Sequence, residues 1–229
     1  MKLSIIIPAY YEGKNILPTI KEIKKLVKTD YEIIVICDDK SDPTIGVIKN
    51  LKKKNIYTAL NSIGSMKGPA NAVKTGFLRA KRGLVGVVMA DLSDDLKKVD
   101  KGVKMIDKGY DIICFSRYMT GGRQIGGPFL KGLMSRMAGL SLFYLFNFPT
   151  HDPTNSFKLY RKTVLQKIKI ESSAGFDFNL ELIVKAHKIG YKIGEIPATW
   201  SDRTAGKSRF KLLKWLPKYL KWYWYLLID

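Results

Sequence analysis

The sequence predicts an α/β fold built on a mostly parallel β-sheet. Short β-branched runs alternate with segments whose apolar residues recur at helical spacing, beginning with Leu3–Ile7 and the helical segment that follows it up to Lys28. This alternation is typical of parallel sheets with right-handed crossovers. The run Leu84–Met89 is almost wholly apolar and rich in Val. Such a run is typical of a strand that is buried on both faces.

The remaining elements follow the same two patterns along the chain. Apolar runs of four to six residues predict strands, and apolar residues spaced by three or four predict helices. The expected strands are Leu3–Ile7, Ile33–Cys37, Ile56–Leu60, Leu84–Met89, Ile112–Phe115 and Tyr191–Ile196. Residues 158–160 follow a polar turn at 151–157 and are not assigned to an element. The expected helices cover residues 16–28, 43–51, 69–80, 97–106, 128–146, 162–166 and 178–190. Four glycines within residues 121–127 predict a flexible connection around Arg123.

Acidic residues follow the central strand directly, at Asp91, Asp94 and Asp95. In open α/β sheets, ligands bind beyond the carboxyl ends of the strands, so we expect these carboxylates to face a ligand. Carboxylate oxygens suit Mg²⁺ or Mn²⁺, which in turn neutralises phosphate groups. The alternative is structural, because Ser93, Asp94 or Asp95 could cap a helix that starts near Lys97.

The composition fits one α/β domain of 229 residues with a C-terminal appendage. Forty Lys and Arg residues against twenty Asp and Glu give a net charge of +20. A field of that sign attracts nucleic acid, anionic membrane or phosphorylated substrates, and it does not choose among them. Cys37 and Cys114 lie inside apolar runs, so we expect buried, reduced thiols in a cytoplasmic setting. We expect no signal peptide, and no apolar run approaches the roughly 20 residues of a membrane-spanning helix.

Two segments are rich in large apolar residues. The helix expected over residues 128–146 has few polar residues, so it is either a core element or a helix lying on a membrane. From Arg209 onward, basic residues alternate with Trp, Tyr and Phe, and Pro217 predicts a kink. Trp and Tyr prefer the headgroup level of a bilayer, and Lys side chains extend from it into water. This tail predicts contact with a membrane surface, with domain packing and nucleic-acid binding as alternatives.

The loop at residues 61–68 and His151 are two further features that we weigh for a role in ligand binding. The Gly-containing loop Asn61–Gly68 leads into the helix expected from Pro69, so it either offers backbone N–H groups to a phosphate or merely connects two elements. It carries neither the GxGxxG nor the P-loop pattern, which disfavours a dinucleotide-binding fold and a P-loop kinase. His151 has no second histidine nearby, so we expect a surface or hydrogen-bonded role rather than metal binding.

An ordered set of motifs resembles the family 2 glycosyltransferases. The set comprises the first strand with Pro8-Ala9-Tyr10-Tyr11-Glu12, the strand end Asp38-Asp39, the central MADLSDD, Ser116-Arg117-Tyr118 with Gly121-Gly122, and DPTNSFKLYR at 152–161. The segment GFDFNLELIVKAHKIGYKIGEIPATWSDRTAGKS, at 175–208, is similar to the end of the polyprenyl-phosphate branch of that family. Together these motifs span almost the whole chain.

The resemblance implies a GT-A fold with a Rossmann-like, mostly parallel sheet flanked by helices. We expect the catalytic domain to cover residues 1–206, and the residue pattern of the basic aromatic tail at 207–229 predicts an amphipathic, membrane-surface helix there. The implied reaction moves a hexose from a nucleotide-diphosphate sugar, of the GDP-mannose or UDP-glucose type, to a dolichyl or other polyprenyl phosphate. The implied cofactor is Mg²⁺ or Mn²⁺.

The resemblance also assigns roles to residues by position. The donor-binding set is Pro8, Ala9, Tyr10, Glu12, Asp39 and Lys207. The metal set is Asp91, Ser93 and Asp94, and the acceptor-phosphate set is Arg117, Lys131 and Ser135. The catalytic set is Asp91, Arg117, Asp152 and Arg203, with Arg203 at the donor phosphate and with Asp152 or Asp177 as positioning residues. Two positions depart from the family pattern, since Met89 stands where an acid is usual and Tyr11 where Asn is usual.

The chemistry of a phosphate acceptor fits these assignments. A phosphate monoester is already an anion near neutral pH, so it needs little deprotonation to attack an anomeric carbon. Catalysis then depends on alignment and on neutralising the leaving diphosphate, and we expect inversion by direct displacement. The expected ligands are the nucleotide-sugar donor and the lipid acceptor. We expect peripheral contact with the cytoplasmic face of a membrane, to which a membrane partner protein could contribute, and we expect no nucleic-acid partner.

Two rival functions stay open from the sequence. One is a family 2 glycosyltransferase that acts on a soluble or polysaccharide acceptor. The other is a catalytically inactive nucleotide-binding or nucleic-acid-binding domain, which the charge and the missing acid at Met89 both favour.

Overall fold

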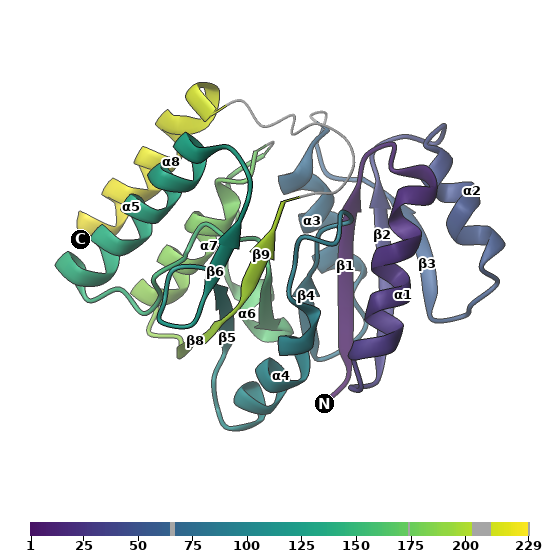
Figure 1. The fold of residues 1–229 in the computed structure, drawn as a ribbon, viewed down its shortest axis with the longest axis horizontal. Helices are drawn as coiled ribbons and strands as arrows, with labels where there is room; N and C mark the ends of the chain where they lie inside the picture. Colours follow the sequence, from purple (N-terminus) through teal and green to yellow (C-terminus); the bar gives the residue numbers. More distant parts are fainter. Residues whose placement is uncertain (65–66, 174, 203–211, 229) are drawn as a thin grey trace.

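The fold centres on one seven-stranded sheet with the strand order β3-β2-β1-β4-β7-β5-β8 (Figure 1). The structure is a computed structural model, and it describes residues 1–64, 67–173, 175–202 and 212–228. All neighbouring strands are parallel except β7, which lies antiparallel between β4 and β5. The strands are β1 Leu3–Ala9, β2 Tyr31–Cys37, β3 Ile56–Leu60, β4 Leu84–Val87, β5 Ile112–Ser116, β7 Lys158–Arg161 and β8 Ile193–Pro197. A separate parallel pair joins β6 Arg123–Ile125 to β9 Thr199–Ser201. The predicted α/β class and mostly parallel sheet are confirmed.

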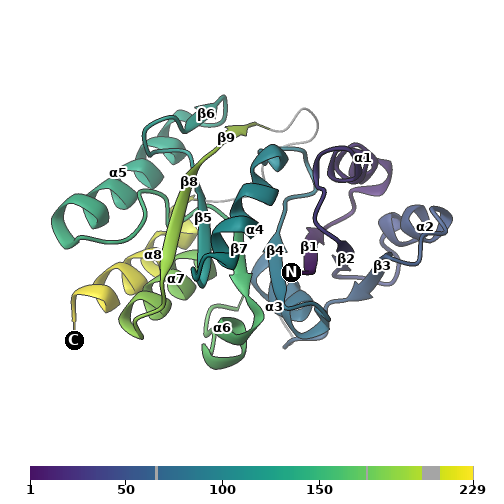
Figure 2. The same ribbon diagram turned by 90° about the horizontal axis from the view of Figure 1, so that it is seen from below.

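Helices cover both faces of the sheet (Figures 1 and 2). The helical elements are η1 Gly13–Asn15, α1 Ile16–Leu26, α2 Pro43–Asn50, α3 Pro69–Arg79, η2 Leu96–Lys98, α4 Val99–Asp107, α5 Phe129–Phe146, α6 Lys162–Lys167, α7 Phe178–Lys188 and α8 Leu212–Leu227. One core cluster joins the sheet to α1, α2 and α4, and the other joins its opposite face to α3, α6 and α7. Apolar burial on both faces explains why the central strands are continuous apolar runs.

Local chemistry sets several helix boundaries and packing distances. Asp42 caps α2, because its Oδ1 accepts a hydrogen bond from the Thr44 N–H at 2.8 Å, and Pro43 follows in the first turn. Helix α3 packs very closely on β1, since a Cβ at Gly76 would lie 2.3 Å from Cγ2 of Ile6. Both cysteines are free and buried, as the sequence predicts.

The structure differs from the sequence predictions mainly in the connections. The flexible segment predicted around Arg123 instead contains β6, and β9 was not predicted at all. Strand β4 ends at Val87, and the next helix starts as the short η2 before α4. At the N-cap of η2, Asp95 makes no side-chain capping bond, and neither does Asp177 at the N-cap of α7. Capping therefore does not explain the acids at these two positions.

Helices α5 and α8 lie side by side at one end of the molecule (Figure 1). The Tyr223 hydroxyl donates to Ser141 Oγ at 3.0 Å and thereby links the two helices. Helix α8 continues through Pro217 and packs on α7 through Trp222, whose side chain is 2% exposed. Among the described helices, none combines the length and apolar content needed to cross a membrane.

Candidate active site

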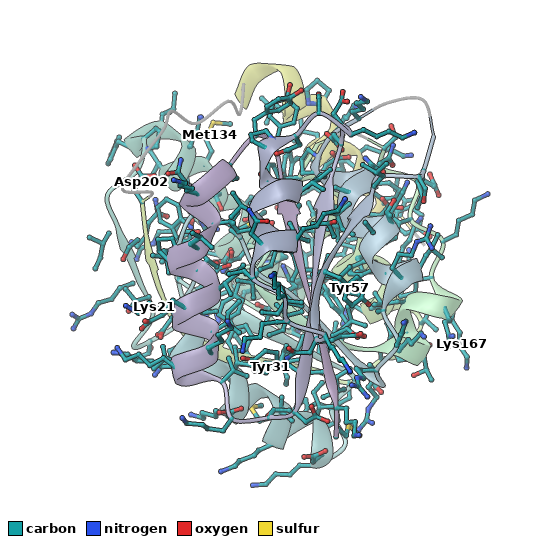
Figure 3. All side chains as sticks on the ribbon, turned by 90° about the vertical axis from the view of Figure 1, so that its right-hand side faces the viewer. Lys21, Tyr31, Tyr57, Met134, Lys167 and Asp202 are labelled. Atoms are coloured by element: carbon teal, nitrogen blue, oxygen red, sulfur yellow. The ribbon has the colours of Figure 1, made fainter. Side chains whose placement is uncertain are left out.

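A cavity of about 290 Å³ opens at the carboxyl edge of the sheet. The ends of β4 and β5 contribute Asp91, Ser93 and Arg117, and α5 contributes Lys131 and Ser135. Five of the residues assigned from sequence therefore meet in one cavity. Its other walls come from Met89, Gln124, Pro128, Gly132, Met134, Ala138, Thr154, Asn155, Ser156, Phe176, Trp200, Asp202, Leu216 and Tyr219. Met134 and Asp202 mark this region in Figure 3.

Arg117 is held by Asp152 across this cavity wall. Its Nε donates to Asp152 Oδ2 at 2.6 Å and its Nη2 donates to Asp152 Oδ1 at 2.8 Å. The same Nη2 lies 3.1 Å from Ser135 Oγ and 3.3 Å from Thr154 Oγ1. The Asp152 side chain is fully buried, whereas the Arg117 side chain keeps 13% of its surface exposed. Asp152 is thus placed to orient Arg117 rather than to touch a ligand in the cavity.

The charges of this pair stabilise each other. Burial by itself raises the pKa of the Asp152 carboxyl, but the adjacent Arg117 charge and its hydrogen bonds hold that pKa below its usual value. Burial likewise opposes the charge on Arg117, and Asp152 raises the pKa of the guanidinium above its ordinary value. Both groups are therefore ionised at neutral pH, and the pair presents a fixed guanidinium to the cavity.

The turn before β7 has its own support. Lys158 is fully buried and donates its ammonium hydrogens to the carbonyl oxygens of Pro153, at 2.9 Å, and Asn155. Burial lowers the pKa of Lys158. These bonds fix the turn that carries Asp152 and Thr154 beside Arg117.

The acidic end of the cavity is formed by the turn after β4. Asp91 lines the cavity, and its Oδ1 accepts a hydrogen bond from the Ser93 N–H at 3.3 Å. Asp94 turns back toward the strand end, where its Oδ2 accepts from the Met89 N–H at 2.7 Å. Removal from water, together with the nearby Asp91 charge, raises the pKa of Asp94 to about 7, despite the hydrogen bond from Met89. Of the two acids assigned to a metal from sequence, Asp91 lines the cavity and Asp94 does not.

The residues assigned to the donor lie outside the lining of this cavity. Pro8 and Ala9 are buried at the end of β1, and Tyr10 follows them with 49% of its surface exposed. Asp39 follows β2, and its Oδ2 lies 2.8 Å from the Nζ of Lys67. The hydrogen bond from Lys67 lowers the pKa of Asp39. Glu12 lies just before η1, so the described members of the donor-binding set gather at the carboxyl ends of β1 and β2, as expected in a parallel sheet.

Several sequence assignments fall elsewhere. Arg203 and Lys207 lie outside the described residues. Asp177 is buried, accepts a hydrogen bond from the Ser172 hydroxyl at 2.7 Å and does not line the cavity. His151 is hydrogen-bonded, because its Nδ1 lies 2.7 Å from Glu195 Oε2. This confirms the hydrogen-bonded role predicted for the histidine.

Trp200 and Asp202 are cavity residues that sequence reasoning missed. They belong to β9 and its end, which are held in place by long-range backbone bonds. The Ser201 N–H donates to Ser93 O at 3.1 Å, and the Asp202 N–H donates to Ile125 O at 2.9 Å. A three-residue strand is too short to show a periodic pattern, so the sequence carries no local signal for it.

The acidic end fits a Mg²⁺ or Mn²⁺ ion of the kind that is shared with substrate phosphates. Among the described residues there is no group of three His, Cys, Asp or Glu side chains that could form a complete protein metal site. Mg²⁺ usually needs only one or two carboxylates, with phosphate and water oxygens completing its shell. Asp91 supplies one carboxylate, and Asp202 lines the same cavity. The thioether of Met89 is a poor ligand for such a hard cation.

The mostly parallel sheet, its flanking helices and the acidic and basic groups at one cavity define a GT-A-like α/β domain. Residues 4–169 match the family model of glycosyl transferase family 2. The chain therefore belongs to glycosyl transferase family 2, and the resemblance read from its motifs is confirmed.

Two curated relatives cover most of the chain. It is 29% identical over 233 aligned residues to a dolichol-phosphate mannosyltransferase of Pyrococcus furiosus. This alignment covers 97% of this chain and 64% of the relative. It is 27% identical over 229 aligned residues to a polyprenol monophosphomannose synthase of Mycolicibacterium smegmatis, covering 92% of this chain and 85% of the relative. The chain thus spans a little under two thirds of the length of the Pyrococcus relative.

Solved structures share the fold. Glucosyl-3-phosphoglycerate synthase from Mycobacterium tuberculosis, in complex with Mn²⁺, UDP and glucosyl-3-phosphoglycerate, superposes with a TM-score of 0.70 at 17% identity, covering 99% of this chain and 78% of that one. The same enzyme in complex with phosphoglyceric acid gives a TM-score of 0.72 at 16% identity, covering 98% and 79%. At this level of identity the likeness establishes the GT-A fold alone.

Proposed function

We propose that this protein is a glycosyltransferase that moves a hexose from a nucleotide-diphosphate sugar to a polyprenyl phosphate, with inversion at the anomeric carbon. The observation that carries the proposal is the arrangement of Arg117 in the cavity. Its Nε and Nη2 are occupied by Asp152, Ser135 and Thr154, but its Nη1 makes no hydrogen bond within the described part of the chain. A fixed guanidinium with an unused donor edge suits a phosphate oxygen.

Lys131 and Ser135 extend this phosphate site. They are four residues apart on α5, so they lie on the same face of the helix, and both line the cavity beside Arg117. Lys131 brings a second positively charged side chain to the cavity that Arg117 lines. These residues would hold the acceptor.

The donor would lie across the ends of β1, β2 and β4. Pro8, Ala9, Tyr10, Glu12 and Asp39 would hold the nucleoside, and Asp91 would meet the diphosphate through Mg²⁺ or Mn²⁺, with Asp202 as a second carboxylate nearby. Such an ion, when bound, neutralises negative charge on the diphosphate. Arg203 keeps its proposed role at the donor phosphate and Lys207 its proposed place in the donor-binding set, and both lie outside the described residues.

The proposed reaction needs no protein nucleophile. An acceptor phosphate oxygen held by Arg117 attacks the anomeric carbon and forms the new C–O bond, while the bond from that carbon to the diphosphate oxygen breaks and its electron pair leaves with the nucleotide. The acceptor is already an anion, so no general base is required. What the protein contributes is alignment of the two phosphates on opposite sides of the sugar, together with charge balance.

The apolar surface of α5 and α8 supports a lipid acceptor over a soluble one. Only Gly139 and Leu142 of α5 are buried, so α5 is not a core helix. Large apolar side chains on the two helices are exposed, namely Phe129, Leu130, Leu133, Met137, Tyr144, Leu145 and Phe146 on α5 and Leu220, Trp224 and Tyr225 on α8. Exposed apolar helix faces next to lysines are typical of helices that lie in a membrane interface. We propose peripheral membrane contact there, on the cytoplasmic face.

A transfer assay tests the proposal directly. The purified chain is given labelled GDP-mannose or UDP-glucose with a polyprenyl phosphate and Mn²⁺, and the lipid-phase product is analysed for its anomeric configuration by NMR. We expect a glycosyl polyprenyl phosphate of inverted configuration from one donor and no product from soluble phosphate monoesters. We expect the transfer rate of R117Q to be at least a hundredfold lower, about the effect of losing one preorganised charge contact. Retention of configuration, or equal transfer to soluble acceptors, would contradict it.

The proposed metal ligand has a separate test that does not depend on turnover. Calorimetric titration measures binding of the nucleotide diphosphate with Mn²⁺ and with EDTA. We expect D91N to weaken the Mn²⁺-dependent binding about tenfold or more and to leave binding in EDTA unchanged. The matched control is D107N, which removes one carboxylate from the exposed end of α4. Equal affinities for D91N and D107N in Mn²⁺ would remove Asp91 from the metal site.

A further inference from the structure

A second, wider depression lies beside the candidate active site. It has a volume of about 810 Å³ and is walled by the loop from Arg117 to Gly127 and by the first turns of α5. Arg123 and Arg136 line it and are both exposed, and its lining contains no Asp or Glu. Neither guanidinium pairs with a carboxylate in the described part of the chain. The depression therefore concentrates positive charge that the described residues leave unbalanced.

The wall of this depression is fixed before any ligand binds. The Gly122 N–H donates to Met119 O at 2.9 Å, and the Arg123 N–H donates to Ala198 O at 3.1 Å. A Cβ at Gly122 would lie 2.4 Å from Ser116 O, so the loop packs directly on the end of β5. Tyr118 also donates its hydroxyl hydrogen to Gln124 Oε1 at 3.1 Å. A preformed concave wall lowers the ordering cost of binding.

Apolar side chains stand at the rim, next to the arginines. Phe129 is 82% exposed, Ile125 is 55% exposed and Leu133 is 40% exposed, and all three line the depression. On α5, Phe129, Leu133 and Arg136 are spaced by four and three residues, which places them along one face of the helix. That face continues the exposed apolar surface of α5 that we assign to the membrane.

We propose that this depression binds the phosphodiester headgroup of an anionic glycerophospholipid, with Arg123 and Arg136 on the phosphate and with Phe129 and Leu133 along the first part of the acyl chains. The inference rests on the membrane contact of the proposed function and extends it. The depression adjoins the acceptor cavity and shares Arg117, Gln124 and Gly132 with it, whereas Arg123 and Arg136 line the depression and not the cavity. The combination of unpaired guanidinium groups with an apolar rim matches an amphiphile. A nucleic acid would leave Phe129 and Leu133 in water.

The test uses monomeric dihexanoyl phosphatidylglycerol, because a lipid in free solution senses a site and not the diffuse potential of a membrane. Binding to the full chain is followed by NMR or calorimetry. We expect saturable binding to the wild type, weakened about tenfold or more in R123Q/R136Q and also weakened in F129S/L133S. The matched control is R79Q/K108Q, which removes two exposed positive charges at the ends of α3 and α4, at the opposite edge of the sheet, and we expect it to bind as the wild type does.

Other ligands and variants separate the possible sources of binding. Inorganic phosphate and glycerol 3-phosphate should bind more weakly than the lipid; equal affinity would show a simple anion site and overturn the lipid assignment. If K131Q abolishes lipid binding while R123Q/R136Q does not, the lipid occupies the smaller cavity and the inference is wrong. Equal losses in R79Q/K108Q and R123Q/R136Q, or no saturable binding to the wild type, would also overturn it.

The proposed function is monitored separately in the same variants. Mn²⁺-dependent binding of the nucleotide diphosphate should be unchanged in R123Q/R136Q, because neither arginine lines the smaller cavity. If the lipid does not bind while the nucleotide still binds, only the proposed headgroup site is wrong. Failure of nucleotide binding in the wild type would remove the proposed function instead.

Discussion

The guanidinium of Arg117 and the carboxylate of Asp152 form two parallel hydrogen bonds, 2.6 Å from Nε to Oδ2 and 2.8 Å from Nη2 to Oδ1. Arg117 directly follows β5 and Asp152 lies in the turn before β7, two segments that become neighbours only because β7 inserts next to β5. The pair fixes the guanidinium that is central to the proposed acceptor site. Its energetic and functional consequences can be measured separately.

Replacing Asp152 should destabilise the protein strongly. D152A leaves Arg117 largely buried without its counter-charge, and breaking a buried pair in this way costs about 3–5 kcal/mol. Urea unfolding measures the change in the free energy of unfolding. In the double variant R117M/D152L the uncompensated charge is gone, so we expect it to be more stable than D152A although it lacks transferase activity. A D152A variant as stable as the wild type would contradict the importance of this pair.

The same pair predicts a pH dependence of stability. The pKa of Asp152 in the folded protein is lower than in the unfolded chain, where it is about 3.9. The contribution of Asp152 to stability is therefore complete above that unfolded value, and it is lost as the pH falls through the folded pKa. Comparing unfolding of the wild type and D152N between neutral and acidic pH isolates the effect. The difference in unfolding free energy between the two proteins should shrink as the pH falls below about 4. A difference that grows with falling pH would contradict a lowered pKa of Asp152.

Gly139 allows α5 to approach the active-site turn. A Cβ at this position would lie 2.0 Å from the backbone oxygen of His151, so G139A must push the helix away from the turn that carries Asp152. We expect a loss of about 1–3 kcal/mol in stability and weaker acceptor binding through displaced Ser135. The control is G46A in α2, where no atom lies within 4 Å of the added Cβ and the helix should gain roughly 0.5–1 kcal/mol. Thermal unfolding compares the two; a stabilised G139A would show that α5 does not pack as described.

Two tryptophans on α8 separate domain packing from membrane contact. Trp222 is 2% exposed, donates its Nε1 hydrogen to Ser172 Oγ at 3.2 Å and lies beneath the ammonium groups of Lys185 and Lys221. Trp224 is 57% exposed. We expect W222A to lose about 3–5 kcal/mol of stability. W224A should keep its stability and bind less to phospholipid vesicles in a flotation assay. Loss of stability in W224A together with unchanged vesicle binding would argue that this face packs on protein.

The two cysteines should be unreactive in the folded protein. Burial raises the pKa of both Cys37 and Cys114 to about 12, so almost no thiolate forms near pH 8. We expect no labelling by a thiol reagent such as DTNB under native conditions and labelling of two thiols after unfolding in guanidinium chloride, since the chain has two cysteines. Rapid native labelling of either one would show that its strand opens locally.

In the C-terminal tail, the two roles that the sequence left as alternatives, membrane contact and domain packing, can be filled by the same helix. The interleaved basic and aromatic residues predicted a membrane surface, with domain packing as an alternative. In the structure, Trp222 packs on α7 while Leu220 and Trp224 stay exposed, so one helix supplies both a packed face and an apolar outer face. The exposed face supports membrane contact as a proposal, and the vesicle experiments decide it.

The sequence by itself determined the alternating strands and helices, the placement of Asp91 and Arg117 at strand ends and the family, because these depend on local periodicity and on short motifs. Only the tertiary structure decided that Asp152 orients Arg117, that Asp94 turns back to the Met89 N–H, and that β9 brings Trp200 and Asp202 into the cavity. Each of these depends on a strand or turn of very few residues whose position is set by backbone bonds to distant parts of the chain. A pattern needs several residues to show a period, whereas one long-range hydrogen bond is enough to place a side chain.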